Sequence, residues 1–171
     1  MKTISFRNDI LPLKNVLYRL ALRITLSHED AEDVVQDTLM KVWSKRNEWP
    51  QIENIEAYAL TTARNIALDK TKRAEANLTT HITTPQVALL EPAVHTEERI
   101  IEQDRLQLVR NLIDQLPEKQ RSCMQLRDVE EKSYREIAQI LNISEEQVKV
   151  NIFRARQTIK QKFKEADEYG L

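Results

Sequence analysis

The chain has 171 residues with 26 basic and 27 acidic side chains, so its formal net charge is only −1 and it is not a globally basic DNA binder. Its single glycine, Gly170, excludes glycine-rich phosphate loops and nucleotide-binding fingerprints, which need glycine wherever the backbone takes positive φ. A lone cysteine, scattered histidines and the lack of any stretch near the ~20 apolar residues of a membrane span exclude disulfides, zinc clusters and membrane insertion. We expect a cytoplasmic, helical protein without cofactor or metal.

Two blocks with helical periodicity flank a segment of different composition. Leu78 to Thr96 contains four threonines in its first half, two prolines and no lysine or arginine. Because β-branched residues and proline disfavour a continuous helix, we interpret this segment as a linker, parts of which dock on another surface through leucine and valine. The predicted fold is all-α, with small helical domains at residues 1–77 and 98–171 joined by a linker at 78–97.

The first block predicts three helices. The first runs from about Ile10 to Thr25, with Pro12 tolerated only in its opening turn. The second follows the cap residue Ser27 and runs to about Lys45, and the third, capped by Asn54, covers residues 55–76.

The second helix carries two distinct faces. One apolar arc should face the core: Ala31, Val34, Val35, Thr38 and Val42. On the other side lie Met40 and Trp43 beside Gln36, with Asp33 and Asp37 one turn apart. An apolar patch rimmed by carboxylates, on a face that should be wet, predicts a surface for a basic protein partner. The alternative is that Trp43 packs under the first helix or the linker.

The third helix should expose a polar face. Its inward residues are predicted to be Ile55, Ala59, Ala63, Ile66 and Ala67, and its outward residues Thr61, Arg64, Asn65, Leu68 and Lys72. Such hydroxyl, amide and cationic groups can donate hydrogen bonds to phosphates and bases, although many ordinary solvated helices look the same.

The second block ends in a predicted helix-turn-helix. An apolar stripe stops at Pro117, and a further helix carries Cys123 and Met124. Two capping boxes follow, opened by Ser133 and Ser144, with a turn at Asn142 between their helices. Asparagine suits this turn because it tolerates the left-handed conformation better than other non-glycine residues.

The last helix combines an apolar stripe with a basic surface. Its inward residues should be Val148, Ile152, Ala155, Ile159 and Phe163. Six basic residues and no acidic residue lie between Lys149 and Lys164. The pattern is typical of a recognition helix that reads the major groove, the alternative being an ordinary helical hairpin.

Several of these segments, in this order and spacing, resemble the sigma-70 family of bacterial transcription initiation factors, and in particular its small two-domain extracytoplasmic-function (ECF) group. DAEDVVQDTLMKVW at residues 30–43 is similar to the polymerase-binding helix of sigma domain 2, and AYALTTARNIALD at 57–69 to its −10 helix. LPEKQR at 116–121, LRDV at 126–129, SYREIA at 133–138, Val148-Lys149 and Arg154-Ala-Arg156 are similar to domain 4.

The resemblance implies a sigma factor that binds core RNA polymerase, recognises the −35 and −10 promoter elements and promotes promoter melting, without being an enzyme. It implies core polymerase contacts by Asp33, Gln36, Asp37, Met40 and Trp43, and −10 contacts by Trp49, Asn54, Thr61, Arg64, Asn65, Lys72 and Arg73. It implies −35 contacts by Glu146, Lys149, Val150, Asn151, Phe153, Arg154, Arg156 and Lys160.

The implied partners are the β′ coiled coil and β flap of the polymerase core, promoter DNA and a membrane-anchored anti-sigma factor, with no small-molecule substrate. In the family, the loop before the third helix, here about Asn47 to Asn54, receives a base flipped from the non-template strand.

Two departures from the family pattern concern the helix-turn-helix. Asn142 stands where glycine is frequent, and Gln147-Val-Lys-Val-Asn151 replaces the common Thr-Val-Lys-Ser-Arg, which predicts an unusual −35 preference. A stand-alone helix-turn-helix regulator with a sensor or dimerisation domain, and an enzyme using Cys123, are the alternative functions. A compact free form with partly covered DNA faces is a further hypothesis.

Overall fold

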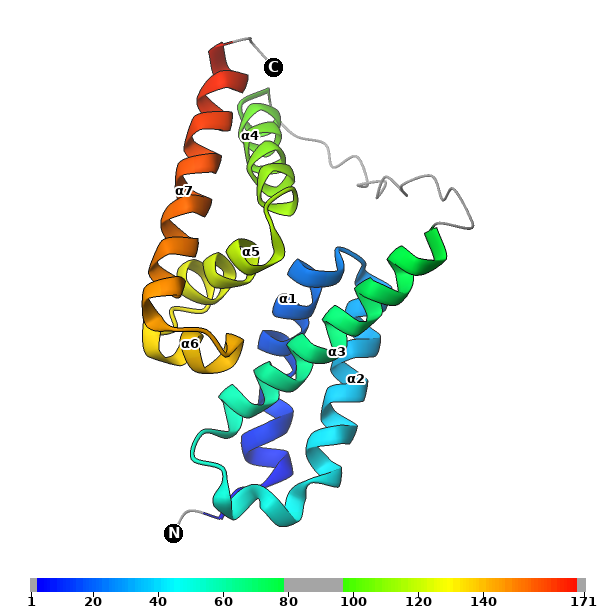
Figure 1. Ribbon diagram of the computed structural model, residues 1–171. Coiled ribbons are helices and arrows are strands. Elements are labelled where there is room, and N and C mark those ends of the chain that lie inside the picture. Colours follow the sequence, from blue (N-terminus) through cyan, green and yellow to red (C-terminus); the bar gives the residue numbers. More distant parts are fainter. Residues whose placement is uncertain (1–2, 79–96, 169–171) are drawn as a thin grey trace.

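The computed structural model describes residues 3–78 and 97–168, and within these ranges every regular element is helical (Figure 1). This confirms the all-α prediction; the linker residues 79–96 lie outside the described part of the chain. The first domain contains η1 (Phe6–Ile10), η2 (Leu11–Leu13), α1 (Lys14–Thr25), α2 (His28–Ser44), η3 (Arg46–Gln51) and α3 (Ile55–Leu78). The second contains α4 (Glu97–Asp114), α5 (Glu118–Met124), η4 (Gln125–Val129), α6 (Tyr134–Leu141) and α7 (Glu145–Glu168).

The first domain is a bundle of α1, α2 and α3, whose buried faces meet in a core built around Leu17, Leu20 and Leu60. All five residues predicted to form the inward face of α2 are buried, as are Ala59, Ala63 and Ala67 of α3. The first helix begins later than predicted. Pro12 lies in the 3-10 turn η2, and α-helical geometry starts at Lys14, because proline has no N–H to donate into a continuing helix.

The second domain confirms the predicted helix-turn-helix of α6 and α7. Ser133 Oγ accepts a hydrogen bond from the Glu136 amide at 3.1 Å, which caps α6. At the start of α7, Ser144 Oγ accepts from the Gln147 amide and Gln147 Oε1 accepts from the Ser144 amide, which completes a reciprocal capping box. Asn142 lies between them at φ 54° and ψ 50°, the left-handed region.

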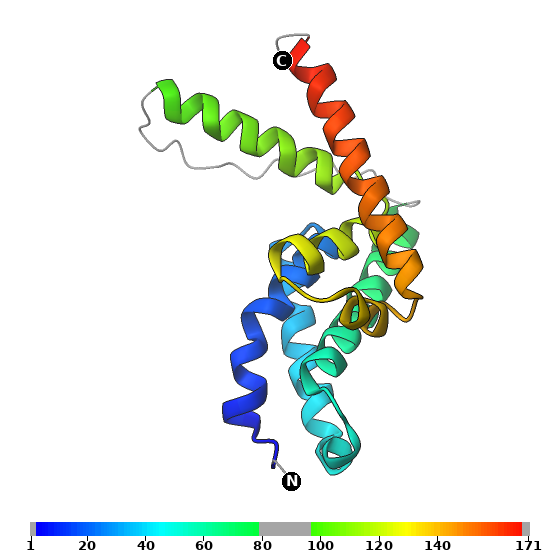
Figure 2. The ribbon, with the colours of Figure 1, turned by 90° about the vertical axis from the view of Figure 1, so that its left-hand side faces the viewer.

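The two domains pack against each other. In Figures 1 and 2, α5 and α6 lie beside α1 and α3, whereas α4 and α7 extend away from the first domain. The buried apolar side chains form one continuous cluster, in which Leu126, Ile137 and Ile140 of the second domain join the core of the first. The compact arrangement therefore has a shared apolar core.

We expect Asn142→Ala to lower the free energy of unfolding by about 1 kcal/mol, because a Cβ without a local polar group disfavours the left-handed conformation. Asn142→Gly should cause no loss, since glycine occupies this region without steric conflict. Urea unfolding followed by circular dichroism measures both values, with the exposed helical Gln157→Ala as control. Equal free energies of unfolding for the alanine and glycine variants would contradict the left-handed conformation of residue 142.

Candidate polymerase and nucleic-acid interfaces

The predicted partner face of α2 is exposed. Met40 and Trp43 retain 71% and 47% of their accessible surface, and Asp33, Gln36 and Asp37 are exposed around them. An apolar hollow of about 360 Å³ lies at this face, lined by Phe6, Leu39, Met40 and Trp43. Side chains of this kind, apolar at the centre and acidic at the rim, suit a partner with an apolar anchor surrounded by basic groups.

Phe6 belongs to this face and was not predicted from the sequence. Its ring meets Trp43 edge to face, with 5.3 Å between centroids. The contact joins η1 to the end of α2, which are far apart along the chain, and so no local sequence pattern indicates it. Trp43 also receives the Arg46 guanidinium over its ring at 4.8 Å, so the indole is held in place while its outer side stays accessible.

Trp49 corrects the predicted −10 surface. It is only 7% exposed, and its Nε1–H donates to the Val42 carbonyl at 3.0 Å. Its ring packs edge to face against Trp43, with 6.0 Å between centroids. The 3-10 turn η3, which contains Pro50, turns the chain back over the end of α2 and places this indole in the core. Trp49 therefore packs against Trp43 and is not available to DNA in this arrangement.

The polar face of α3 is divided between open and covered residues. Asn65 and Lys72 are exposed, as predicted for an outward face, and Arg73 beside them is exposed as well. Arg64 is only 9% exposed, because its guanidinium forms two hydrogen bonds with the Glu118 carboxylate of α5, at 3.1 and 3.0 Å. The Thr61 hydroxyl donates to the Ile140 carbonyl of α6 at 3.1 Å. The prediction that Thr61 and Arg64 face solvent is thus wrong for this conformation.

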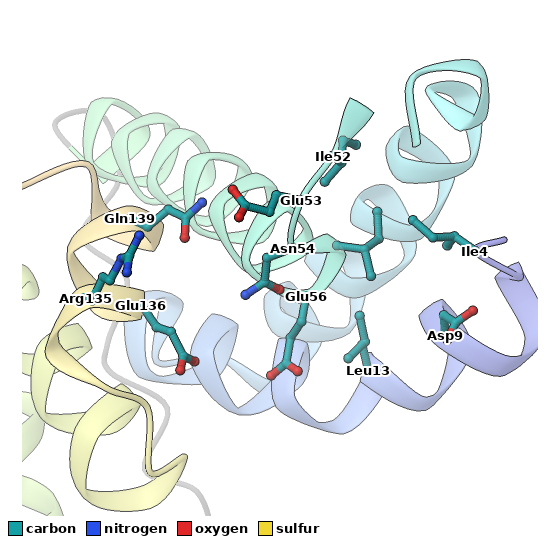
Figure 3. Close-up of a pocket in the computed structure, with 11 residues that line it drawn as sticks. Ile4, Asp9, Leu13, Ile52, Glu53, Asn54, Glu56, Arg135, Glu136 and Gln139 are labelled. Carbon is teal, nitrogen blue, oxygen red and sulfur yellow. The ribbon is translucent and has the colours of Figure 1, made fainter. Parts of the chain in front are cut away.

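The segment before α3 lines a cleft of about 700 Å³ between the domains (Figure 3). Glu53, Asn54 and Glu56 line the cleft on the first domain's side. Arg135, Glu136 and Gln139 of α6 line the opposite side. Asn54 also caps α3, because its Oδ1 accepts from the Ala57 amide at 3.1 Å.

The outward surface of α7 is open. Phe153 and Val150 are exposed by 63% and 45%, and Glu146, Lys149, Arg154 and Lys160 are exposed beside them. Asn151 is half-buried and its side-chain amide donates to the Gln147 carbonyl at 2.8 Å. Arg156 pairs with Asp128 of η4, and this hydrogen bond raises its pKa. The helix therefore presents apolar and cationic groups together, as a base-reading helix requires.

Cys123 is fully buried, and burial raises its thiol pKa to about 11. Within residues 3–78 and 97–168, no cluster of histidine, cysteine and carboxylate residues could hold a metal ion. None of the helices in the same ranges combines the length and the apolar composition that a membrane span needs.

Comparison with known proteins finds two families on this chain. Sigma-70 region 2 matches residues 10–76, and sigma-70 region 4 matches residues 106–159. The chain is 27% identical over 147 residues to the ECF RNA polymerase sigma factor SigM of Bacillus subtilis (strain 168), which covers 85% of this chain and 87% of the relative. It is 21% identical over 159 residues to SigW of the same strain, covering 89% and 85%.

Solved structures share the fold. The sigma factor RpoE from Bartonella quintana, in complex with the anti-sigma factor NepR, superposes with a TM-score of 0.74 over 95% of this chain and 98% of that chain, at 24% identity. CnrH, in complex with the cytosolic domain of CnrY, superposes with a TM-score of 0.62 over 89% and 82%, at 18% identity.

These matches cover both helical domains in the order that the sequence motifs predicted. The chain belongs to the sigma-70 family of RNA polymerase sigma factors, within its ECF group. A stand-alone helix-turn-helix regulator is not favoured, because it leaves the region 2 match over the first domain unexplained.

We expect the Cys123 thiol of the folded protein to be unreactive near neutral pH. The thiolate is the nucleophile, and a pKa of about 11 leaves roughly one thiol in a thousand ionised at pH 8. An aromatic disulfide reagent, followed by absorbance, should therefore react far more slowly with native protein than with protein unfolded in urea. Equal rates would show an accessible, activated thiol and would revive the enzyme hypothesis.

Proposed function

We propose that this protein binds core RNA polymerase through α2, holds the −10 element with α3 and the segment before it, and reads the −35 element with α7. The observation that carries the proposal is the exposed Met40 and Trp43 pair, rimmed by Asp33 and Asp37, in a chain that also presents an open helix-turn-helix. One surface is acidic and apolar and the other is basic, so they suit a protein partner and a DNA partner respectively.

The α2 face would meet the β′ coiled coil of the core. Trp43, Met40 and Phe6 would form its apolar centre, because they line one hollow and two of them are already packed together. The exposed carboxylates of Asp33 and Asp37 would guide and orient a basic surface. A face that is formed before binding loses little side-chain entropy on association, which favours affinity.

The −10 element would be held as a partly single-stranded segment. Asn54 would lie at the pocket for a flipped base, and exposed Asn65, Lys72 and Arg73 would bind the strand along α3. Flipping a base costs a few kcal/mol, which stacking and hydrogen bonding in a pocket offset. Melting would then be driven by binding, without a catalytic residue.

The −35 element would be read as duplex DNA. Lys149, Arg154 and Lys160 would neutralise phosphates, while Val150 and Phe153 offer apolar surface to thymine methyl groups. Glu146 can accept from a cytosine amino group, and Asn151 and Arg156 flank the surface.

We propose that the chain also binds two further protein partners. A groove between α4, α5 and α7 is a candidate site for the β flap of the core, and it is lined by Val109, Met124, Arg156, Ile159, Lys160 and Phe163. RpoE was solved in complex with the anti-sigma factor NepR, and CnrH in complex with the cytosolic domain of CnrY. We infer that this chain also has an anti-sigma factor, membrane-anchored as is common in the group. We infer that it acts in the cytoplasm, because core polymerase and the chromosome lie there.

We expect Asp33→Arg combined with Asp37→Arg to weaken binding to core polymerase by at least ~100-fold, about 2.8 kcal/mol, because both changes place like charges against a basic partner. Biolayer interferometry with immobilised core measures the affinity. Duplex DNA binding by α7 should persist, since these residues lie on the other domain.

The matched control is Glu165→Arg combined with Asp167→Arg, which makes the same change of charge at the far end of α7. It should keep core binding. If the Asp33/Asp37 variant still bound core polymerase, the proposed interface would be wrong. If the wild-type chain with core polymerase alone failed to direct promoter-specific RNA synthesis, the proposed function would be wrong.

We expect duplexes selected by the full chain from a random pool to differ from the common family −35 element. The physical reason is that Val150 and Asn151 replace a serine and an arginine of the common family motif. Val150→Ser with Asn151→Arg should restore preference for the common element. It should also steepen the dependence of log affinity on log salt by about 1, because one phosphate contact is added. Recovery of the common element by the wild-type chain would refute the prediction.

A further inference from the structure

The basic side chains of α7 differ in their surroundings. Of the six between Lys149 and Lys164, Arg156 is the one that forms an ion pair within the described part of the chain, and its partner is Asp128 of η4. Asp128 stands 28 residues earlier in the chain, so folding brings this carboxylate to α7. A carboxylate here lowers the positive charge of a surface that the proposed function gives to DNA, so its contribution to binding is not simple attraction.

Asp128 holds one edge of the Arg156 guanidinium. The Nε–H donates to Asp128 Oδ2 at 3.4 Å, and Nη2 donates to Oδ1. A guanidinium carries five N–H groups in one rigid plane, and this pairing uses two of them. The other edge, formed by Nη1 and the second N–H of Nη2, is left for another ligand. The Arg156 side chain retains 51% of its accessible surface, so an approaching phosphate can reach it.

A second cation on the same flank of α7 is held from the same direction. The Lys149 ammonium lies over the Tyr134 ring at 5.6 Å from its centroid, and the Arg127 guanidinium lies over this ring at 4.3 Å. Lys149 and Arg156 are seven residues apart, or nearly two helical turns, so their side chains leave α7 on the same side. The chain from η4 to the start of α6 therefore braces two cations of the neighbouring helix.

A fixed cation affects DNA binding differently from a mobile one. An arginine side chain carries about 2 kcal/mol of rotamer entropy, and one that a carboxylate already holds loses less of it when a phosphate binds. Phosphate contacts fix the register of a protein on the duplex, whereas base contacts supply the sequence preference. A fixed Arg156 would therefore fix where Val150 and Phe153 meet the bases.

We propose that Asp128 is a positioning residue for the −35 element: it holds the Nε/Nη2 edge of Arg156 and aims the Nη1/Nη2 edge at a DNA phosphate. This inference rests on the proposed function, which gives α7 to the −35 duplex. The aimed phosphate contact sets the register of α7 in the major groove and so raises the preference for a matching sequence. Because Asp128 is itself negative, it also weakens the general attraction of α7 for DNA. One carboxylate thus lowers affinity and raises selectivity.

The test uses the opposite signs of these two effects. The probes are a duplex that the wild-type chain selects from a random pool and a duplex of random sequence, and fluorescence anisotropy measures both affinities. Asp128→Ala removes the carboxylate, Asp128→Glu keeps it, and Arg156→Ala removes the guanidinium. Asp167→Ala is the matched control, because it removes the same charge from an exposed residue at the far end of α7.

We expect Asp128→Ala to bind the random duplex at least as tightly as the wild type does, because a negative charge is removed. Its binding to the selected duplex should weaken, so that the ratio of the selected to the random affinity falls about tenfold. Asp128→Glu should retain most of this ratio, and Asp167→Ala should leave it unchanged.

A double-mutant cycle separates positioning from a structural role. In an Arg156→Ala background, Asp128→Ala should leave the affinity ratio unchanged, because the side chain that it positions is absent. Arg156→Ala alone should flatten the dependence of log affinity on log salt by about 0.9, since one phosphate contact is lost.

Equal gains in affinity for the two duplexes in Asp128→Ala would show that Asp128 only repels DNA, and would overturn the proposal. A fall in the ratio that persists in the Arg156→Ala background would overturn it as well, because Asp128 would then act on the structure of the domain. In both cases a wild-type chain that selects a sequence keeps the proposed function. A wild-type chain that selects none rejects the −35 assignment, and the role of Asp128 with it.

Discussion

Two hydrogen bonds between the Arg64 guanidinium and the Glu118 carboxylate join the first domain to the second. This contact ties the middle of α3 to the first turn of α5, and it is supported by a buried hydroxyl and a shared apolar core. An arginine in such a site needs an anionic partner, because a buried cation without one is costly. The second domain supplies this anion in the compact form.

Charge in this small protein is segregated, and the net charge of −1 hides this. Exposed carboxylates cluster on α2, cations run along α7, and the interdomain surface pairs the arginines of α1 and α3 with acids of the second domain. Oppositely charged surfaces on one chain attract each other unless each is already paired with a specific partner. Here the acids that meet the first domain's arginines come from α4, α5 and the residue after η4, so the basic α7 surface is left open.

Features governed by local sequence were predictable. The capping boxes at Ser133 and Ser144, the left-handed Asn142 and the inward face of α2 each follow from residues within a few positions of one another. The exposed Met40 and Trp43 pair followed from the same periodicity, because the core face left it on the opposite side.

Features governed by distant contacts were not predictable in this way. Phe6 reaches Trp43 because α1 and α2 are antiparallel, which places the start of the chain beside the end of α2. Trp49 is buried because η3 turns over Val42. Arg64 has the spacing of an outward residue on α3, and only the position of α5 makes it buried. Periodicity identifies the side of a helix that faces away from its own domain, but it carries no information about a second domain packed there. The covered residues are therefore the ones that distinguish this compact chain from two independent helical domains joined by a linker.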